Sequence, residues 1–527
     1  MKPGKDEKGI VNVGKKDIAK TYKKLHKWPG LIIAFVLLNF GISGIVLNHR
    51  GFFSSLDVKR SVLPRVYRYA NWNNAALKGD LVVAPDSILV FGNIGIWVTD
   101  SAFEAYRPLN EGFGKGVDRR KTYDLHRMAN GDLYAATHFG LYAFSPDRQS
   151  WVPFHLVSDN QRFVALESVG DTLYALNRSH LFTGRSDGVN TTFVRHQLPA
   201  PPGYEDRVGL FETIWQLHSG EAFGGIGKVF VDLLALVTLF LSITGILYFF
   251  FPGWMKRRKK RERPVQSLAR ANRWSLRWHN HFGAWVFVFL IFLYFTGMFL
   301  RPPLLIPIAN ARVGPLKFSN LDQDNPWFDR CRDLLWDGEK QYFLLATSEG
   351  IHELDPTLSH VVPLPSQPPV SVMGITVLVP FHHGVYVVGS FSGLFLWDPA
   401  QGRVLNFYTG QPYEGRSAGR PIGDVQVTGI LQDHLGRPYC IDYNQGVQAL
   451  WPNAPDFPTM PAEVVEASGM SLWNVALEFH TGRIFQSVLG PFYILIVPLA
   501  GLTGITVVLS GYLLWRKRFR KKKLEKN

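Results

Sequence analysis

Four stretches of the chain are long and apolar enough to cross a lipid bilayer as helices, which requires roughly 20 residues for a ~30 Å hydrocarbon layer. They cover residues 29–49, 226–252, 282–301 and 489–515. Lys228 and Asp232 lie in the first turns of the second stretch, at an i, i+4 spacing that allows them to pair on one helix face. The pattern predicts a membrane bundle of four transmembrane helices.

Between these stretches the pattern changes to short β-type runs. Each of the long segments 50–217 and 302–479 contains three copies of a β-rich run, a polar turn, and then a glycine or a substitute that begins a second run. The spacing is 45 residues from Gly95 to Gly140 and 43 from Gly350 to Gly393. A period of about 40–50 residues with paired short strands is typical of propeller blades.

Three blades are too few to close a ring, because propellers have at least about four. We therefore expect the blades within 81–200 and 330–455 to combine into one composite six-bladed β-propeller. Two separate β-sandwich-like domains are the alternative that the pattern leaves open.

The apolar part of the chain is an internal duplication of a helical hairpin. His26 and Gly44 match His279 and Gly297 at an offset of 253 residues, and His218-Ser219-Gly220 matches His480-Thr481-Gly482 at an offset of 262. A repeat of this kind determines architecture. Here it also places a metal-ligating residue type at both edges of the membrane in each copy.

Basic residues are concentrated in three short segments that flank the spans. Segments 1–27, 253–277 and 516–527 hold 27 of the 57 Lys and Arg residues but only five of the 42 acidic ones. By the positive-inside rule, both termini are cytoplasmic and the two β-rich segments are outside. The net charge of +15 therefore indicates membrane lipid as the partner, not nucleic acid. The first span is interpreted as an uncleaved signal anchor.

These patterns divide the chain into nine parts. They are the cytoplasmic N-terminus 1–28, the first span 29–49, a β-rich segment 50–217, the second span with its outer lead-in 218–252, a basic cytoplasmic loop 253–281, the third span 282–301, a second β-rich segment 302–479, the fourth span with its lead-in 480–515, and a basic cytoplasmic tail 516–527.

The repeated histidines are the candidate cofactor ligands. Haem iron without covalent attachment is commonly held by neutral imidazole, and helical bundles build cofactor sites from facing helices. A pseudo-two-fold axis along the membrane normal would pair His26 with His279 near the cytoplasm and His218 with His480 near the outer surface. A single interfacial histidine is usually a headgroup-level residue, but four at repeat-equivalent positions favour two haem b sites. The spare candidates are His49 and His281.

Small and aromatic residues near the histidines fit this interpretation. Glycines would allow close approach of a macrocycle or a neighbouring helix, and aromatic rings could flank it. These residues are Gly30, Gly44, Gly245, Gly283, Gly297 and Gly511, with Trp28, Phe223, Trp278 and Phe485.

The motifs His-x-x-x-Gly at the beginning of a span and His-[Ser/Thr]-Gly-x-x-Phe before the return span resemble the PepSY-associated transmembrane family. That family includes iron-regulated inner-membrane proteins and siderophore-iron reductases. The resemblance covers about 22–49, 214–254, 276–301 and 474–515. It implies a bacterial inner-membrane protein that holds haem b through histidines and passes electrons to ferric siderophores in the periplasm.

The β-rich segments differ from the small α/β domains expected of the family, so the electron acceptor stays open. The donor is expected to be quinol or a separate reductase, since the cytoplasmic loop is too short for a flavin or nicotinamide domain. A membrane oxidoreductase of the ferric-chelate reductase type is favoured, although no catalytic residue is identifiable. A non-redox accessory or transport component of siderophore uptake is the alternative. A sensor fits less well, since no cytoplasmic output domain is evident.

Other motifs are few. The chain has two cysteines, Cys331 and Cys440, both in the second β-rich segment, where a disulfide and two buried thiols are both compatible with the sequence. There is no CxxCH motif for covalent haem attachment and no cysteine set for a cluster or structural zinc.

Overall fold

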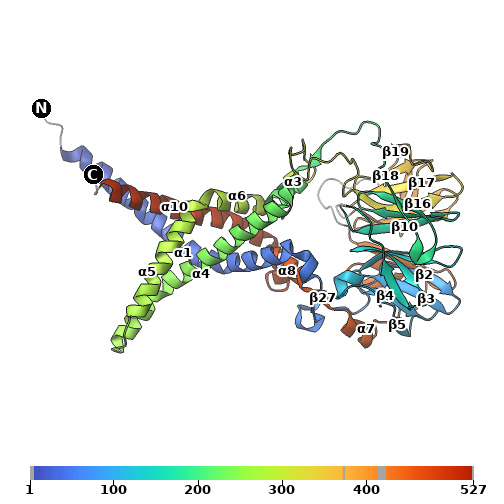
Figure 1. Ribbon diagram of the computed structural model, residues 1–527, viewed down its shortest axis with the longest axis horizontal. Coiled ribbons are helices and arrows are strands. Elements are labelled where there is room, and N and C mark those ends of the chain that lie inside the picture. Colours follow the sequence, from blue (N-terminus) through green and yellow to red (C-terminus); the bar gives the residue numbers. More distant parts are fainter. Residues whose placement is uncertain (1–4, 159, 372–373, 414–422, 525–527) are drawn as a thin grey trace. The chain divides into compact units, whose positions relative to one another are not determined.

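The apolar stretches of the sequence fold as long helices, and the alternating stretches fold as small antiparallel sheets (Figure 1). The computed structural model describes residues 5–158, 160–371, 374–413 and 423–524. The chain divides into a helical unit, Met1–Phe53, Asp206–Asp322 and Trp473–Asn527, and a β unit, Ser54–Glu205 and Gln323–Leu472. Each unit is thus assembled from segments that are far apart in the sequence.

Three helices of the helical unit are long and apolar enough to cross a membrane. They are α1 (Lys5–Asn48), α4 (Gly224–Lys260) and α10 (Ile496–Leu524). These helices correspond to the first, second and fourth predicted spans. Helix α1 contacts both α4 and α10, so the two ends of the chain lie together in the bundle.

The third predicted span, 282–301, is not a single straight helix. It falls on α5 (Gln266–Trp285) and α6 (Phe287–Met298), which meet at an angle of 69°. Helix α6 has 12 residues, which is about 18 Å of helix and too short to cross the hydrocarbon layer by itself. The bundle therefore has three candidate spans, or four if the bent pair is one span.

The two lead-ins to α4 and α10 both turn at a left-handed glycine after a short helix, as the duplication predicts. Helix α3 (Leu210–Ser219) ends at Gly220 with φ 81°, and α8 (Leu472–His480) is followed by Gly482 with φ 74°. Left-handed glycine is the usual way to end a helix. A Cβ on Gly220 would also lie 2.2 Å from the carbonyl oxygen of Gly227, so the sharp return to α4 requires glycine there.

Short elements complete both lead-ins. The first contains η5 (Glu221–Phe223), and the second contains η7 (Arg483–Phe485), α9 (Gln486–Leu489) and η8 (Gly490–Leu495).

Lys228 and Asp232 do not pair with each other, although their spacing allows it; each has another polar partner. The Nζ of Lys228 lies 2.8 Å from the Glu221 carboxylate. The Asp232 carboxylate accepts a hydrogen bond from the Asn48 side chain at 2.9 Å. Each charge thus has a polar partner outside helix α4, Glu221 in η5 and Asn48 at the end of α1.

Within its described residues, the β unit contains six antiparallel sheets of three or four strands, each built from strands that are consecutive in the sequence, and one further two-stranded sheet. The first segment contributes β2 (Gly79–Ala84), β3 (Ser87–Gly92), β4 (Gly95–Thr99) and β5 (Tyr106–Pro108); β6 (Thr122–Arg127), β7 (Leu133–Thr137), β8 (Gly140–Ser145) and β9 (Ser150–Pro153); and β10 (Phe163–Val169), β11 (Thr172–Asn177), β12 (Leu181–Arg185) and β13 (Val194–His196). The second contributes β16 (Cys331–Asp337), β17 (Tyr342–Thr347), β18 (Ile351–Leu354) and β19 (Val361–Pro363); β20 (Ile375–His382), β21 (Val385–Ser390), β22 (Gly393–Asp398) and β23 (Arg403–Asn406); and β24 (Val427–Gln432), β25 (Pro438–Asp442) and β26 (Gly446–Ala449).

The first strands of the six sheets contact one another in sequence order. These contacts run from β2 through β6, β10, β16, β20 and β24, and they return from β24 to β2. Carboxylates on the first strands reach the next sheet: Asp124 accepts from the Leu166 N–H at 2.7 Å, and Asp80 accepts from the Gln432 N–H at 2.9 Å. The first and last sheets of the chain are thereby linked directly.

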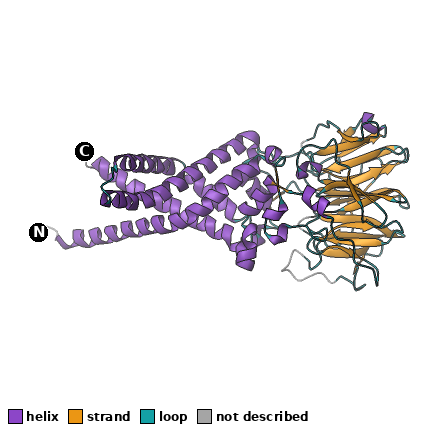
Figure 2. Cartoon of the chain, turned by 90° about the horizontal axis from the view of Figure 1, so that it is seen from below, coloured by secondary structure: helices purple, strands orange, loops and turns teal. Residues whose placement is uncertain are grey.

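The two β-rich segments form one unit rather than two separate domains. Apolar cores lie between consecutive sheets, and one of them joins the first sheet to the last through Trp72, Val90 and Ile441. Outside the six sheets, β1 (Asp57–Val58) pairs with β27 (Met470–Ser471). Figure 2 shows the sheets gathered in this unit and the long helices in the other.

Both cysteines are buried free thiols, Cys331 on β16 and Cys440 on β25. The two-thiol alternative therefore holds, and the disulfide does not form. Burial is the main cause that raises the pKa of the Cys331 thiol to about 12, which makes it a poor nucleophile.

Candidate functional site

The helical unit brings the four repeated histidines together as two pairs. The ring centroids of His26 and His279 are 6.1 Å apart, and those of His218 and His480 are 6.2 Å apart. These are the two pairings that the duplication predicts. Whether they bind a metal stays a prediction, but the two rings of each pair lie close together, with their planes inclined by 77° in the first pair and by 56° in the second.

Each pair takes its members from two different copies of the hairpin. His26 lies on α1 and His279 on α5, whereas His218 and His480 lie in the last turns of α3 and α8. Along α1, His26 is 18 residues from Gly44, which contacts His480. At 1.5 Å per residue the two pairs are thus about 27 Å apart along the helix, close to the thickness of the hydrocarbon layer.

Backbone carbonyls orient one histidine of each pair. The Nδ1 of His26 lies 2.9 Å from the carbonyl oxygen of Val507, and the Nδ1 of His218 lies 3.1 Å from that of Leu293. A carbonyl can only accept a hydrogen bond. The proton of each neutral ring is therefore on Nδ1, and Nε2 keeps its lone pair.

Hydroxyl groups orient the other two histidines. The Nδ1 of His279 lies 2.9 Å from Thr244 Oγ1, and the Nδ1 of His480 lies 2.9 Å from Ser43 Oγ. These hydroxyls already donate to the carbonyls four residues earlier in their helices, Thr244 at 2.7 Å and Ser43 at 2.6 Å. Each hydroxyl must therefore accept the proton of Nδ1, so Nε2 is again the free lone pair.

A glycine that follows a Ser or Thr faces each of the four imidazoles. A Cβ built on Gly297 would lie 2.8 Å from Cε1 of His218, and one on Gly511 would lie 2.7 Å from Cε1 of His26. The matching distances are longer at Gly44 (3.5 Å to His480) and Gly245 (3.6 Å to His279). The pairs are Ser43-Gly44, Thr244-Gly245, Thr296-Gly297 and Ser510-Gly511.

The sequence interpretation identified these glycines but missed the hydroxyl residues before them. Their signal was available, because Ser/Thr-Gly occurs in each of the four apolar stretches. Two other predicted glycines serve the packing of helices. Gly30 faces Val507, and Gly283 faces Leu241.

The spare candidates His49 and His281 lie outside both pairs. The Nδ1 of His49 lies 2.9 Å from the carbonyl of Ile45 in its own helix, and its Nε2 lies 3.8 Å from the Asp232 carboxylate. His281 lies on the exposed side of α5 between two tryptophan rings, at 6.0 Å from Trp278 and 5.6 Å from Trp285. Neither residue faces a second histidine.

The predicted flanking aromatics pack mainly on other aromatic rings. Trp28 contacts Phe249 at 5.5 Å, Trp278 stacks on Phe282 at 5.4 Å, and Phe485 contacts Phe479 at 6.1 Å. Phe223 is 52% exposed. A ring that does lie against a paired histidine is Phe40, at 5.3 Å from His480, and the sequence interpretation did not select it.

The donor set fits haem better than a bare metal ion. Within the described residues, no group of three or more His, Cys, Asp or Glu side chains is placed to hold a metal ion, whereas protein zinc sites use three or four such ligands. A porphyrin supplies the remaining ligands itself, so two axial imidazoles suffice. If two imidazoles bound one metal ion from opposite sides with bonds of about 2 Å, their ring centroids would be roughly 6 Å apart. The centroid distances of both pairs agree with this value.

Comparison with known proteins identifies a family. The model of the family described as the PepSY-associated TM region matches residues 23–518, so the matched range includes the β-rich segments. No curated protein matches the chain.

Solved structures give only distant similarities. One similar structure is the extracellular domain of the putative hybrid two-component system BT4673 from B. thetaiotaomicron. The match covers 72% of this chain and 38% of that structure, at 12% identity and a TM-score of 0.33. The match with the N-terminal domain of Nup159 covers 70% of this chain and 74% of that structure, at 10% identity and a TM-score of 0.30. This chain thus spans well under half of the first of these structures, and similarities at this level support no argument.

Proposed function

Because the chain belongs to the PepSY-associated TM region family, we propose that its two histidine pairs hold two b-type haems in a bacterial inner membrane. The observation that supports this proposal is the common geometry of the pairs. Both are about 6 Å from centroid to centroid, and all four rings keep Nε2 free while Nδ1 is hydrogen-bonded. Metal-ligating histidines nearly always have their second nitrogen bonded in this way.

The proposed membrane arrangement counts α5 and α6 as one broken span, which gives four spans. Helix α4 ends in Arg257, Arg258, Lys259 and Lys260, and basic residues mark the cytoplasmic side. His279 contacts the half of α4 nearer this end. The pair His26–His279 is therefore assigned to the cytoplasmic side, both termini to the cytoplasm, and His218–His480 to the periplasmic side.

For the β unit we propose a six-bladed propeller in the periplasm with three blades from each segment. Two observations support it: the first strands contact one another in a cycle that returns to β2, and each sheet is a meander of neighbouring strands. Propellers are built from sheets of this kind arranged around a central channel.

The proposed activity is transfer of electrons across the membrane to a ferric siderophore or another ferric chelate. Haem iron with two imidazole ligands supplies reversible one-electron chemistry. The protein's own residues hold the group at two depths about 27 Å apart along α1. They also position each imidazole against a glycine of a neighbouring helix. One electron from quinol or a separate reductase would reduce one Fe(III) to Fe(II), which chelates hold less tightly.

An absorption spectrum of the purified protein tests this proposal. Protein produced with adequate haem should show a Soret band and an α band that sharpens with dithionite, with two haems per chain. The variant His218→Ala/His480→Ala should retain one haem. His49→Ala/His281→Ala is the matched control and should retain both.

The spectrum, followed by a mixing experiment, decides between the proposed activity and the alternative. Wild-type protein without a Soret band would reject haem binding and leave an accessory or transport role in siderophore uptake. If haem is bound, mixing the reduced protein with a ferric siderophore and a ferrous trap should reoxidise the protein and colour the trap at the same rate. Reoxidation no faster than in buffer would reject iron reduction.

A further inference from the structure

Three cationic side chains of the β unit converge on one aromatic ring. The Nζ of Lys78 lies 5.0 Å from the ring centroid of Tyr123, the Nζ of Lys121 lies 5.7 Å away, and the Cζ of Arg162 lies 5.4 Å away. Each cation immediately precedes the first strand of its sheet, β2, β6 or β10. We call these four residues the cationic mouth, because they lie where the first strands of three neighbouring sheets begin.

Backbone structure fixes the positions of these side chains. Tyr123 is the extra residue of a β-bulge, since Thr122 pairs with Thr137 while Asp124 pairs with Ala136. A bulge turns a side chain away from its normal direction and is common beside functional sites.

Lys78 is held between two sheets by its main chain. Its N–H donates to the carbonyl of Phe91 at 2.7 Å. On the other side, a Cβ built on Gly429 of β24 would lie 1.8 Å from the carbonyl oxygen of Lys78, so the last sheet approaches this residue as closely as glycine permits. The fold thus places the lysine at the junction of the first and last sheets.

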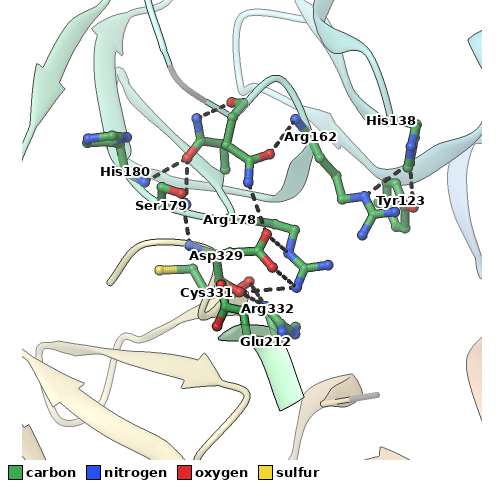
Figure 3. A network of polar contacts seen from close by, with 12 residues as sticks. Tyr123, His138, Arg162, Arg178, Ser179, His180, Glu212, Asp329, Cys331 and Arg332 are labelled. Carbon is green, nitrogen blue, oxygen red and sulfur yellow. Dashed lines mark hydrogen bonds and ion pairs between the residues drawn. The ribbon is translucent and has the colours of Figure 1, made fainter. Parts of the chain in front are cut away.

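His138 connects Arg162 to Tyr123 without adding charge. The Arg162 Nε donates to the Nδ1 of His138 at 3.0 Å, and the Tyr123 hydroxyl lies 2.9 Å from the same nitrogen (Figure 3). A nitrogen that accepts from an arginine carries no proton, so the buried His138 ring is neutral with its proton on Nε2. In the part of the chain that the structure describes, Arg162 has no hydrogen bond through its terminal nitrogens.

The nearby carboxylates are bound elsewhere. Asp329 forms an ion pair with Arg178 at 2.8 Å and accepts from the Asn160 side chain (Figure 3). Asp80, two residues after Lys78, accepts from the Gln432 N–H of the last sheet. Among the described residues, no carboxylate forms an ion pair with Lys78, Lys121 or Arg162.

Three like charges near one ring repel one another, and burial adds to this cost. Burial is the largest cause that lowers the pKa of Lys78 to about 8; Tyr123 acts in the opposite direction, and Lys121 and Arg162 lower the pKa further. Such an arrangement is unfavourable for the free protein. It becomes favourable when an anion is bound, because charge-assisted hydrogen bonds then replace the repulsion.

We propose that the cationic mouth is a binding site for a small polyanion that presents two or more carboxylate or phosphate oxygens to Lys78, Lys121 and Arg162. The site is separate from the histidine pairs, and the inference does not rest on the proposed electron transfer. Binding is measurable on oxidised protein without an electron donor.

Titration calorimetry of the purified full-length protein in a non-ionic detergent tests the site with two probes, citrate and pyrophosphate. At least one should bind, and its affinity should fall as salt is raised. Stronger binding of citrate would assign carboxylate ligands, and stronger binding of pyrophosphate would assign phosphate ligands. If neither probe binds the wild-type protein at millimolar concentration, the proposal is rejected.

Variants localise the binding. Lys78→Gln/Arg162→Gln should bind the preferred probe about tenfold or more weakly. Lys115→Gln/Arg148→Gln removes the same charge from two exposed residues of the β unit and should bind like the wild type. Equal affinities of the two double variants would reject the site.

A stability measurement separates binding from a structural role. Without anion, Lys78→Gln/Arg162→Gln should unfold at the same or a higher temperature than the wild type, because the substitution relieves repulsion. The probe should then raise the unfolding temperature of the wild type but not of the variant. If the double variant does not fold, the single variant Lys121→Gln is measured instead, because the side chain of Lys121 is only half-buried. Its affinity for the probe should be about threefold or more below that of the wild type.

Discussion

The imidazole of His218 lies against the α-carbon of Gly297, so closely that a Cβ there would stand 2.8 Å from the ring's Cε1. In the same pair, the ring of His480 faces Gly44 at 3.5 Å, which is ordinary van der Waals contact. The two glycines therefore differ in how strictly they are required, although the duplication makes them equivalent in sequence.

Gly297→Ala should displace His218 and remove the haem that we propose for the His218–His480 pair. Overpacking of this kind costs about 1–3 kcal/mol, and the displaced ring can no longer oppose His480. Haem content should fall from two to about one per chain, measured by pyridine haemochrome on purified protein. Gly44→Ala is the matched control and should retain both haems. Equal haem loss in the two variants would show that the contact with His218 is not the cause.

In the His26–His279 pair the hydroxyl of Thr244 should act as a positioning group for His279. Thr244→Val keeps the shape but leaves the Nδ1 proton without its acceptor, and loss of such a partner typically weakens metal-site affinity by about 10–100-fold. We expect the variant to lose haem faster on dilution and to have a shifted midpoint potential. Thr244→Ser should restore both values.

A matched control for this prediction is Thr506→Val. Thr506 also donates to the carbonyl four residues earlier, Leu502, at 2.9 Å, but it contacts no histidine. If Thr506→Val changes the midpoint potential as much as Thr244→Val does, the effect comes from helix stability and not from orientation of the imidazole.

The β unit should fold only when both segments are present. Apolar cores join the first sheet to the sixth and the third to the fourth, so each segment alone would expose two buried sheet faces. Residues 54–205 expressed alone should aggregate, whereas co-expression with residues 323–472 should give a soluble complex, as judged by gel filtration. A monomeric, cooperatively unfolding product from residues 54–205 would contradict the shared core.

The pairing of the histidines could be predicted because it follows from symmetry. A constant offset of 253 residues between His26 and His279 requires equivalent places in two copies of the hairpin, and one axis then brings them together. The break between α5 and α6 could not be predicted in this way. Residues 282–301 are as apolar as the other spans, and the bend at Val286 involves no proline or charge.

The cationic mouth shows a second limit of sequence reasoning. Lys78, Lys121 and Arg162 are 43 and 41 residues apart, close to the repeat period, but each by itself is an ordinary charged residue before a strand. Their convergence depends on the β-bulge at Tyr123 and on the contact between the first and last sheets. Both are tertiary features that leave no local pattern in the sequence.

Anion binding at the cationic mouth should weaken as the pH rises above 8. The pKa of Lys78 is about 8 in the folded protein, compared with an ordinary value of 10.5, so this residue loses its charge as the pH rises through 8. The affinity for the preferred probe should fall between pH 7 and pH 9 in the wild type. In Lys78→Gln it should be lower throughout and nearly independent of pH over this range.

The same depressed pKa has a consequence for stability without ligand. Between pH 8 and about 10.5 the unfolded chain binds a proton at Lys78 that the folded protein does not, so the contribution of this residue to the free energy of unfolding rises with pH in that window. The difference in unfolding temperature between the wild type and Lys78→Gln should therefore shift in favour of the wild type from pH 7 to pH 9.5. A difference that does not change over this range would mean that neither burial nor the neighbouring Lys121 and Arg162 lowers the pKa of Lys78, and the anion site would lose its electrostatic basis.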